Sequence, residues 1–500
     1  MTGFLSSLLP VGPADPLFWV LGLPLAGALV MALLPDWRHA AWLNVLVSAA
    51  TFGAAACLVF VRPVETPLLF IDDFNIYLVG LTAFVGFSTA MFSAAYIGRE
   101  SRIRRLAPRN LRFYHSMYQA FLFTMLLALT ANNIGVLWGA GEAATLTTVL
   151  MVSLYRTREA IEAAWKYFIL CSVGIGLALF GTVLVYLAAQ PVMGDGVAAM
   201  AWSQMIRRAG AFQPELISLA FVFLLVGYGT KVGLAPLHAW LPDAHAEGPT
   251  PISAVLSGLL LNVALYALLR FKMLIAANGH ALQPGPLMIG MGCSSIFVAS
   301  FMLYRRGDIK RLFAYSSIEH MGIITFAFGM GGALANFAGL LHMTMHSLVK
   351  SAIFFAVGMI TQATGTKRIA DIRGLTARAP LLGWCFVVAV LAIAGLPPMG
   401  IFMSEFLVIS STFARDALLA VPVMIGLLIT FGALIWRLQG MAFGPPGQWV
   451  PDSERTHQSA LVRAVGMAPL VIHLILALIA GIYLPDALVA WFQAVGKLLG

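Results

Sequence analysis

The feature that most constrains this 500-residue chain is a succession of apolar runs, each about 18–25 residues long. A helix needs about 20 residues to cross a bilayer, whereas a strand of a membrane barrel needs only about ten. Charged residues make up 10% of the chain, against roughly 25% in soluble proteins. The sequence therefore predicts an all-α polytopic membrane protein.

The polar interruptions separate about fourteen helices. The first run has no basic flank before it, so we interpret it as a retained helix and not a signal peptide. The tail from Pro485 to Gly500 is expected to form a short interfacial helix. The predicted spans are 16–34, 41–61, 74–97, 115–131, 133–155, 164–188, 216–240, 250–275, 285–304, 314–332, 335–361, 381–410, 417–440 and 465–484.

Two of these helices contain proline breaks. Helix 7 is interrupted at Ala235-Pro236 and helix 12 at Gly395-Leu396-Pro397-Pro398. The breaks are five helices apart, and an odd spacing predicts two five-helix repeats of inverted topology, as in transporters whose sites lie near the midplane. The expected parts are helices 1–3 (1–114), a first repeat (115–275), a second repeat (276–440), and helix 14 with the tail (441–500).

The basic residues predict the orientation. Of the 30 Lys and Arg, 21 fall in the odd-numbered loops and 7 on the other side, while Lys231 and Lys350 lie within helices. Because cytoplasmic loops are rich in Lys and Arg, both termini should face outward from a bacterial inner membrane. The same distribution accounts for the sequence pI of about 9.5 without a nucleic-acid partner.

The stretch from Gly227 to Leu261 places a lysine, a proline break and several titratable residues close together. Lys231 at bilayer depth costs about 2.5–3.5 kcal/mol, so it requires a partner or a wet cavity. The break is tolerated only where the freed backbone groups face protein or water. We interpret His238, directly after the break, as part of an ion pathway. Asp243, His245 and Glu247 fit either an access funnel or simple loop hydration.

Helix 5 carries Glu142 without a cation in the same helix. Such a carboxylate must be neutralised or find a positive partner, and Lys231 is the candidate. A pair that opens and closes would release a proton from the lysine. The alternative is a static ion pair that holds two helices together.

Helix 11 carries His342, His346 and Lys350 at i, i+4 and i+8, which forms one polar stripe on an apolar helix. We interpret this stripe as a proton relay. Two histidines at i, i+4 also fit a zinc site, but no HExxH glutamate lies between them. We therefore assign no metal ligand.

Further charged and titratable residues lie in or beside the second repeat. Glu319 and His320 in helix 10 could feed protons to the helix 11 stripe, while Asp308, Lys310 and Arg311 before them are expected to anchor a loop. Glu405 follows the helix 12 break and is the counterpart of Lys231. On the outer side, Asp72 and Asp73 are expected to cap helix 3 or to be interface residues.

The four cysteines are scattered singly through apolar segments and show no ligand spacing. No iron–sulfur cluster or haem is therefore expected in this chain, and we assign it no cofactor of its own.

Five segments resemble the antiporter-like subunits of respiratory complex I, energy-converting hydrogenases and multisubunit cation/proton antiporters. They are the helix 5 glutamate segment, GTKVGLAPLHAWLPDAHAEGPTP, DIKRLFAYSSIEHMG, HMTMHSLVKSAIFF and GLPPMGIFMSEF. The resemblance covers roughly residues 70–440 and is greatest to subunits of hydrogenase-4 and formate hydrogenlyase-type complexes.

The resemblance implies fourteen helices with two inverted five-helix bundles and proton movement along a midplane line of Lys, His and Glu. Glu142 and Lys231 would be the coupling pair, Lys350 the central relay and Glu405 the terminal residue. Respiratory members often carry Lys or His in helix 8, whereas this chain has Ser257 and Asn262 there. Direct proton transfer across helix 8 would then need water or His320.

The expected function is proton translocation in a redox-driven complex of the hydrogenase-4 or formate hydrogenlyase type. Its partners would be other membrane subunits, a peripheral redox module containing Ni-Fe and Fe-S centres, membrane lipids, and protons or Na⁺. The alternatives are a Na⁺/H⁺ antiporter subunit, a subunit of a respiratory NADH-quinone oxidoreductase, and a passive anchor. The cost of burying four charged side chains argues against the anchor.

Overall fold

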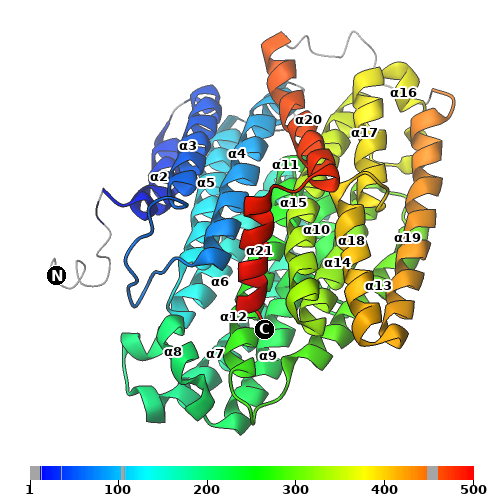
Figure 1. Cartoon of the computed structure of the whole chain (residues 1–500). Coiled ribbons are helices and arrows are strands. Elements are labelled where there is room, and N and C mark those ends of the chain that lie inside the picture. The colour runs from blue at the N-terminus through cyan, green and yellow to red at the C-terminus, as the bar shows by residue number, and fades with distance from the viewer. Residues whose placement is uncertain (1–11, 13, 35, 103–105, 107, 447–459) are drawn as a thin grey trace.

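The described residues form one bundle of long helices that run side by side (Figure 1). The computed structural model describes residues 12, 14–34, 36–102, 106, 108–446 and 460–500. Within these ranges, β pairing is limited to three isolated bridges in loops. Arg104, Arg105 and Arg455, which contribute to the predicted charge bias, lie outside the described residues.

The main helices, in chain order, are α2 (Pro16–Leu33), α3 (Trp37–Cys57), α4 (Asp73–Arg102), α5 (Pro108–Thr130), α6 (Ile134–Val152), α7 (Arg158–Met193), α8 (Trp202–Arg208), α9 (Pro214–Val232), α10 (Trp240–Glu247), α11 (Thr250–Val255), α12 (Leu261–Ala276), α13 (Pro284–Arg305), α14 (Ile309–Met330), α15 (Ala333–Thr364), α16 (Leu375–Arg378), α17 (Pro380–Ile393), α18 (Gly400–Arg415), α19 (Ala417–Phe443), α20 (Ala460–Ile482) and α21 (Asp486–Leu498). A π-helical segment, η4 (Leu256–Leu260), joins α11 to α12.

By length and composition, eleven helices among the described residues can cross a membrane. The remaining predicted spans correspond to α5, to α14 and to the pair α17 and α18, which the helix 12 break separates. The predicted all-α polytopic class and its fourteen segments are confirmed.

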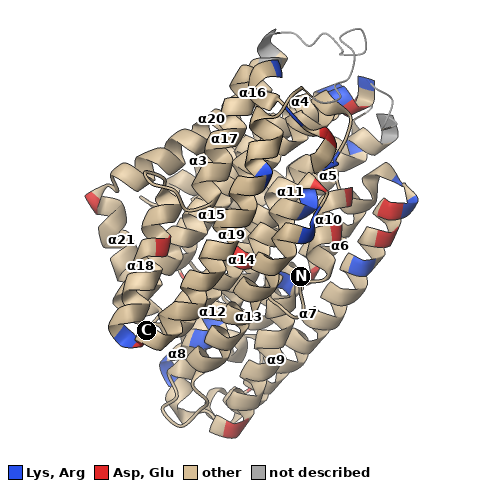
Figure 2. Ribbon diagram, turned by 90° about the vertical axis from the view of Figure 1, so that its right-hand side faces the viewer, with Lys and Arg blue, Asp and Glu red and all other residues tan. Residues whose placement is uncertain are grey.

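Alternate loops meet at opposite ends of the bundle. At one end, Asp308 bridges to Arg368, and Lys367 forms a salt bridge with Glu247 at 3.0 Å. At the other end, Leu69 bridges to Ala131. Lysines and arginines gather mainly at the first end (Figure 2), as the loop count predicts.

The two predicted helix breaks share a Gly-Leu-Xaa-Pro sequence, 233–236 in the first and 395–398 in the second. Gly233 and Gly395 have left-handed φ angles of +80° and +70°, which favour glycine because it lacks a Cβ. Each glycine therefore ends a helix inside the bundle, and the chain resumes as α10 after the first break and as α18 after the second.

The protein satisfies the backbone groups that the first break frees. The indole of Trp240 donates to the carbonyl of Thr230 at 2.7 Å, and the amide of Ala235 donates to Ser295 Oγ at 2.9 Å. A break in apolar surroundings is stable only with such partners. These contacts hold the end of α9 in a defined position.

The centre of the bundle consists of α15 and of helix 8. Helix 8 is the eighth predicted span, which comprises α11, η4 and α12, and is not the short α8. The apolar window of helix 8, within 250–276, is entirely buried, and that of α15 is 89% buried, whereas outer helices such as α2 and α3 are 33% buried. Because α11 and η4 pack directly on α15 and α12 packs on α9, helix 8 lies where the two halves meet.

The tail forms α21, but the expectation of a helix resting at the membrane surface is wrong. This helix runs along the bundle beside α4 and α15 (Figure 1). Phe492 is 1% exposed and packs edge-to-face on Tyr77 with ring centroids 4.9 Å apart. The apolar face of the helix is thus used for packing.

Asp72 does more than cap α4. Its carboxylate accepts two hydrogen bonds from Arg270, both at 2.7 Å. Arg270 is 1% exposed and its guanidinium lies 4.5–5.2 Å from four aromatic ring centroids. Burial raises the pKa of Asp72, but the charge and hydrogen bonds of Arg270 outweigh burial and leave the pKa below its usual value.

We predict that Asp72→Asn lowers the free energy of unfolding by about 3 kcal/mol, because Arg270 is left buried without its counter-charge. Since the pKa of Asp72 is lowered in the folded state, this stabilisation is present above the unfolded pKa near about 3.9 and is lost as the pH falls through the folded value. Thermal unfolding in detergent should show a smaller acid-dependent loss in the variant than in the wild type.

The matched control is Asp73→Asn, because Asp73 pairs with Arg62 through side chains that are 35% and 50% exposed. Exposed pairs contribute about 0–1 kcal/mol. Equal effects of the two substitutions would contradict the assignment of the Asp72–Arg270 pair as structural.

Candidate functional site

Lys231 lies in the last turn of α9, beside the first break, and is 2% exposed. Its ammonium donates hydrogen bonds to the carbonyl of Gly141 and to Thr145 Oγ1, both on α6. The end of a helix also places unpaired carbonyl groups near a cation, which favours the charge there. The break is therefore what makes a buried lysine tolerable at this position.

Glu142 lies on α6 between the two residues that hold Lys231, but it forms no salt bridge with the lysine within the described chain. It accepts a hydrogen bond from Ser172 of α7 at 3.3 Å, and its Oε2 atom is buried without a partner. The predicted pair is thus adjacent but separated. Neutral oxygens bind the lysine in place of the carboxylate.

Lys350 is fully buried in α15 and donates to the carbonyl of Phe313 on α14 at 3.0 Å. Ser317 donates to the same carbonyl at 3.0 Å, and its hydroxyl lies 2.8 Å from that of Ser257 in η4. A hydrogen-bonded link therefore connects Lys350 to helix 8 at the point where this helix lacks a titratable residue.

The π-helical geometry of η4 matters for this link. Such segments are rare and are frequent at functional sites, because the wider turn disturbs the normal backbone hydrogen bonds. The carbonyl of Gly258 accepts a hydrogen bond from Ser347 on α15 at 2.7 Å, and Asn262 donates to the same serine at 2.7 Å. These contacts hold the π segment against α15.

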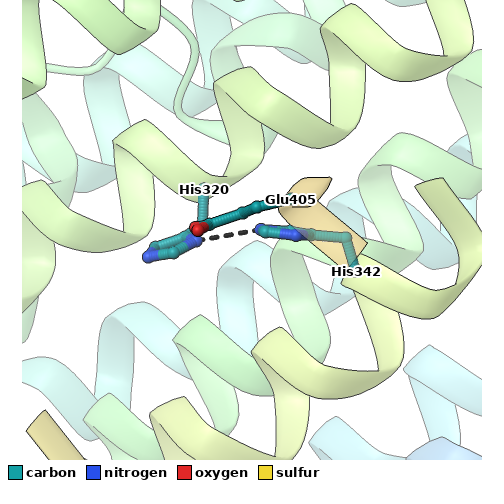
Figure 3. A group of neighbouring side chains, drawn as sticks. All are labelled: His320, His342 and Glu405. Carbon is teal, nitrogen blue, oxygen red and sulfur yellow. Dashed lines mark hydrogen bonds between the residues drawn. The ribbon is translucent and has the colours of Figure 1, made fainter. Parts of the chain in front are cut away.

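His320, His342 and Glu405 converge from α14, α15 and α18 (Figure 3). The imidazoles are joined by a hydrogen bond of 2.9 Å between His320 Nδ1 and His342 Nε2. His342 Nδ1 lies 2.9 Å from Ser404 Oγ, which itself donates to the carbonyl of Ile401. This serine therefore accepts from His342, which leaves Nε2 as the lone-pair nitrogen.

Two further predicted residues lie beside this cluster without hydrogen bonds. The ring centroid of His346 is 5.8 Å from that of His320, and both of its nitrogens are buried with no hydrogen-bond partner among the described residues. Glu319 is fully buried, and neither of its oxygens has a partner within the described chain. Buried groups of this kind are costly unless they exchange protons or bind water.

A cavity of about 570 Å³ opens at the end of the bundle where lysines and arginines gather, which we call the basic end, and it reaches Lys310 and Glu247. Lys310 is 3% exposed and donates to the carbonyl of Gly248 at 2.5 Å. His245, on α10, is fully buried, and its ring stacks on Phe354 at 5.1 Å between centroids. Phe354 is one turn beyond Lys350 on α15, and Ala246, next to His245, lines the cavity, so His245 is near both.

The remaining polar residues of the loop between helices 7 and 8 have other roles. Asp243 pairs with Lys166 and Arg311 at 3.3 and 3.1 Å, and Glu247 pairs with Lys367 at 3.0 Å. They hold loops together. His238 lies apart from Lys350 and from the cluster of His320, His342 and Glu405. Its ring centroid is 6.1 Å from that of Tyr315.

The structure thus brings together the predicted residues of the second half and leaves Glu142, Lys231 and His238 separate from them. Lys310 anchors a loop through the carbonyl of Gly248, but its sequence context does not indicate that it is buried beside the cavity, and the role of His245 stays open from the sequence. Ser257, Ser317 and Ser404 were not assigned a role. Serine is common in membrane helices, so the presence of these serines does not by itself indicate a functional role. Only the lack of a charged residue in helix 8 pointed to the region around Ser257.

Gly395 provides a test of Glu405, the expected last residue of the proton route, because a Cβ added at Gly395 would lie 2.1 Å from Glu405 Oε2. We predict that Gly395→Ala displaces this carboxylate and also costs about 1–2 kcal/mol of left-handed strain. The proton movement that the resemblance implies should then be lost in membrane vesicles. Gly194→Ala is the control, because Gly194 also has a positive φ of +76° but nothing lies within 4 Å. Equal loss in both variants would show that strain alone is responsible.

Residues 131–431 match the membrane family described as NADH:quinone oxidoreductase/Mrp antiporter. A hydrogenase-4 component F homolog of Methylacidiphilum infernorum is 56% identical over 476 residues, covering 95% of this chain and 98% of that protein. NADH-quinone oxidoreductase subunit N of Desulforudis audaxviator is 28% identical, covering 72% of this chain and 70% of that protein.

Solved structures share the fold. A chain of an archaeal membrane-bound sulfane sulfur reductase matches with a TM-score of 0.83 at 22% identity, over 97% of both chains. A chain of the Mrp complex from Dietzia sp. matches with a TM-score of 0.80 at 16% identity, over 98% of this chain and 97% of that one. The family match over residues 131–431 and the 56% identical relative show that the protein belongs to the family of antiporter-like membrane subunits found in NADH:quinone oxidoreductases and Mrp antiporters.

Proposed function

We propose that this chain translocates protons as a membrane subunit of a redox-driven complex of the hydrogenase-4 or formate hydrogenlyase type. The observation that carries the proposal is the buried line of Lys350, His320, His342 and Glu405, with His245 beside it. The identity of 56% over 95% of the chain to a hydrogenase-4 component F homolog supports the type of complex.

Protons enter from the cavity beside Lys310 and reach Lys350 through His245. The support for this step is geometric: Lys310 lines the cavity, and His245 is buried against α15 with both nitrogens unpartnered. A neutral imidazole can accept a proton on one nitrogen and release it from the other.

From Lys350 the route continues past His346 to the hydrogen-bonded pair of His320 and His342, and then to Glu405. His320 is the junction, because it contacts His342 directly and lies beside His346. Glu405 stands at the second helix break, where irregular backbone at membrane depth typically lines an ion pathway.

Glu142 and Lys231 act as the coupling pair of the first half. In the described arrangement neutral oxygens hold Lys231, and the carboxylate of Glu142 has one free oxygen. Closing this pair would stabilise the charged lysine, and opening it would favour proton release. The hydroxyls of Ser257 and Ser317, together with water, then carry the connection between the halves in place of a helix 8 lysine, because the carbonyl of Phe313 accepts from both Ser317 and Lys350 but cannot itself transfer a proton.

The proposed location is the bacterial cytoplasmic membrane, with the basic end of the bundle facing the cytoplasm and both termini outside. The partners are other membrane subunits and a peripheral module that contains the Ni-Fe and Fe-S centres.

Purification of the tagged protein in mild detergent should therefore recover nickel together with iron. Iron and flavin without nickel would favour a respiratory dehydrogenase.

We predict that Lys231→Met abolishes redox-driven proton uptake by inverted membrane vesicles and leaves the complex assembled. A neutral side chain of similar size keeps the packing of α9 but removes the group that gains and loses a proton. The control is Lys272→Met, because Lys272 is a buried lysine that donates to the carbonyl of Leu499 at 2.9 Å and lies away from the line. Unchanged uptake in the first variant would defeat the proposed mechanism.

Uptake by the same vesicles also distinguishes whether protons or Na⁺ are transported. If protons move without Na⁺, uptake should be unaffected by replacing Na⁺ with K⁺. Uptake that needs Na⁺ and no electron donor would favour the antiporter alternative instead.

We predict that Ser257→Ala slows proton uptake about tenfold, equivalent to about 1.4 kcal/mol on the barrier, while Ser257→Thr retains it. Alanine removes the hydroxyl link to Ser317, and threonine keeps a hydroxyl. Ser347→Ala is the control, since Ser347 bonds Gly258 and Asn262 but not Ser317. A similar loss in both alanine variants would indicate a packing defect of η4, not a broken link.

A further inference from the structure

We propose that His320, His342 and Glu405 form a binding site for a divalent transition-metal ion such as Zn²⁺, which competes with protons at the cluster. One ligand atom from each residue lies within 4.8 Å of the other two. Two imidazoles and one carboxylate are a donor set that such ions prefer. All three side chains are at least 92% buried.

The side chains come from three different helices, α14, α15 and α18, and point toward one another (Figure 3). In a tetrahedral site the ligand atoms stand about 3.4 Å apart, because each lies about 2.1 Å from the ion. The nitrogens of the two histidines are 2.9 Å apart. Small rotations of the imidazole rings would therefore be enough to admit an ion.

His342 already has the protonation that a ligand needs. Its Nδ1 donates to Ser404 Oγ at 2.9 Å, so Nε2 carries the lone pair and faces His320. This arrangement of a ligating histidine held by a hydrogen bond on its other nitrogen is typical of metal sites. His320 would release the proton on Nδ1 and ligate through that atom. Its Nε2, which is buried without a partner, would then carry the proton.

Charge also favours a cation at this position. Glu405 forms no salt bridge with any residue that the structure describes, so its charge has no nearby counter-ion when it is ionised. A metal ion bound to the carboxylate would supply that charge and would take the place of the proton between the two imidazoles, which moves to His320 Nε2. An occupied site would block proton movement from His320 to Glu405; this consequence rests on the proposed function, whereas binding itself does not.

The test uses the intact complex, purified in detergent and stripped with EDTA. Co²⁺ serves as a spectroscopic probe of tetrahedral coordination, and Zn²⁺ is then used to displace it. We expect one site per chain, binding lost in His342→Ala, and affinity weakened roughly 10–100-fold in Ser404→Ala, which retains all three ligands. His115→Gln is the control, because His115 is a buried, unpartnered histidine on α5.

Three results would overturn the site: no Co²⁺ spectrum in the wild type, equal binding in His342→Ala, or a loss in His115→Gln equal to that in His342→Ala. Assembly on native gels separates lost binding from lost folding, and Ser404→Ala tests the site where His342→Ala fails to assemble. Zinc that binds as expected but leaves proton uptake unchanged would support the site and would count against the proposed pathway through it.

Discussion

Everything in this bundle depends on how polar groups inside a membrane find partners within the protein. Unsatisfied backbone groups cost several kcal/mol in hydrocarbon, yet the chain interrupts two of its membrane helices. It does so with a Gly-Leu-Xaa-Pro sequence at each break and with donors from neighbouring helices, such as Trp240 and Ser295. The first break ends α9 beside Lys231, and the second leaves room for Glu405 beside Gly395. The helix breaks that shape the bundle therefore also position Lys231 and Glu405, two residues of the proposed proton route.

The centre of the molecule illustrates a second solution to the same problem. Helix 8 has no titratable residue at the point where respiratory relatives often have one, and it is entirely buried. Its π-helical segment instead places Ser257 against Ser317, which shares an acceptor carbonyl with Lys350. A hydroxyl both donates and accepts a hydrogen bond, so it can connect two halves without the desolvation cost of another charge.

Most of the fold could be predicted from the sequence, because hydrophobic length and proline breaks are local properties. The fourteen segments and both breaks were recognisable in this way. The tail was not, since the amphipathic pattern around Phe492 fits a membrane surface as well as a protein groove. Within the site, Lys350, His342 and His346 shared a visible helical stripe. His245 had no such pattern, because its burial depends on how the chain folds back after the first break.

The sequence by itself determined the membrane class, the breaks and the types of titratable groups, because each follows from the composition of a single segment. Tertiary structure alone decided which groups touch. It separated Glu142 from Lys231, placed Lys310 beside a cavity and brought His320, His342 and Glu405 together from three helices. Contacts between helices depend on their rotation and depth in the bundle, and the packing of the whole chain sets both.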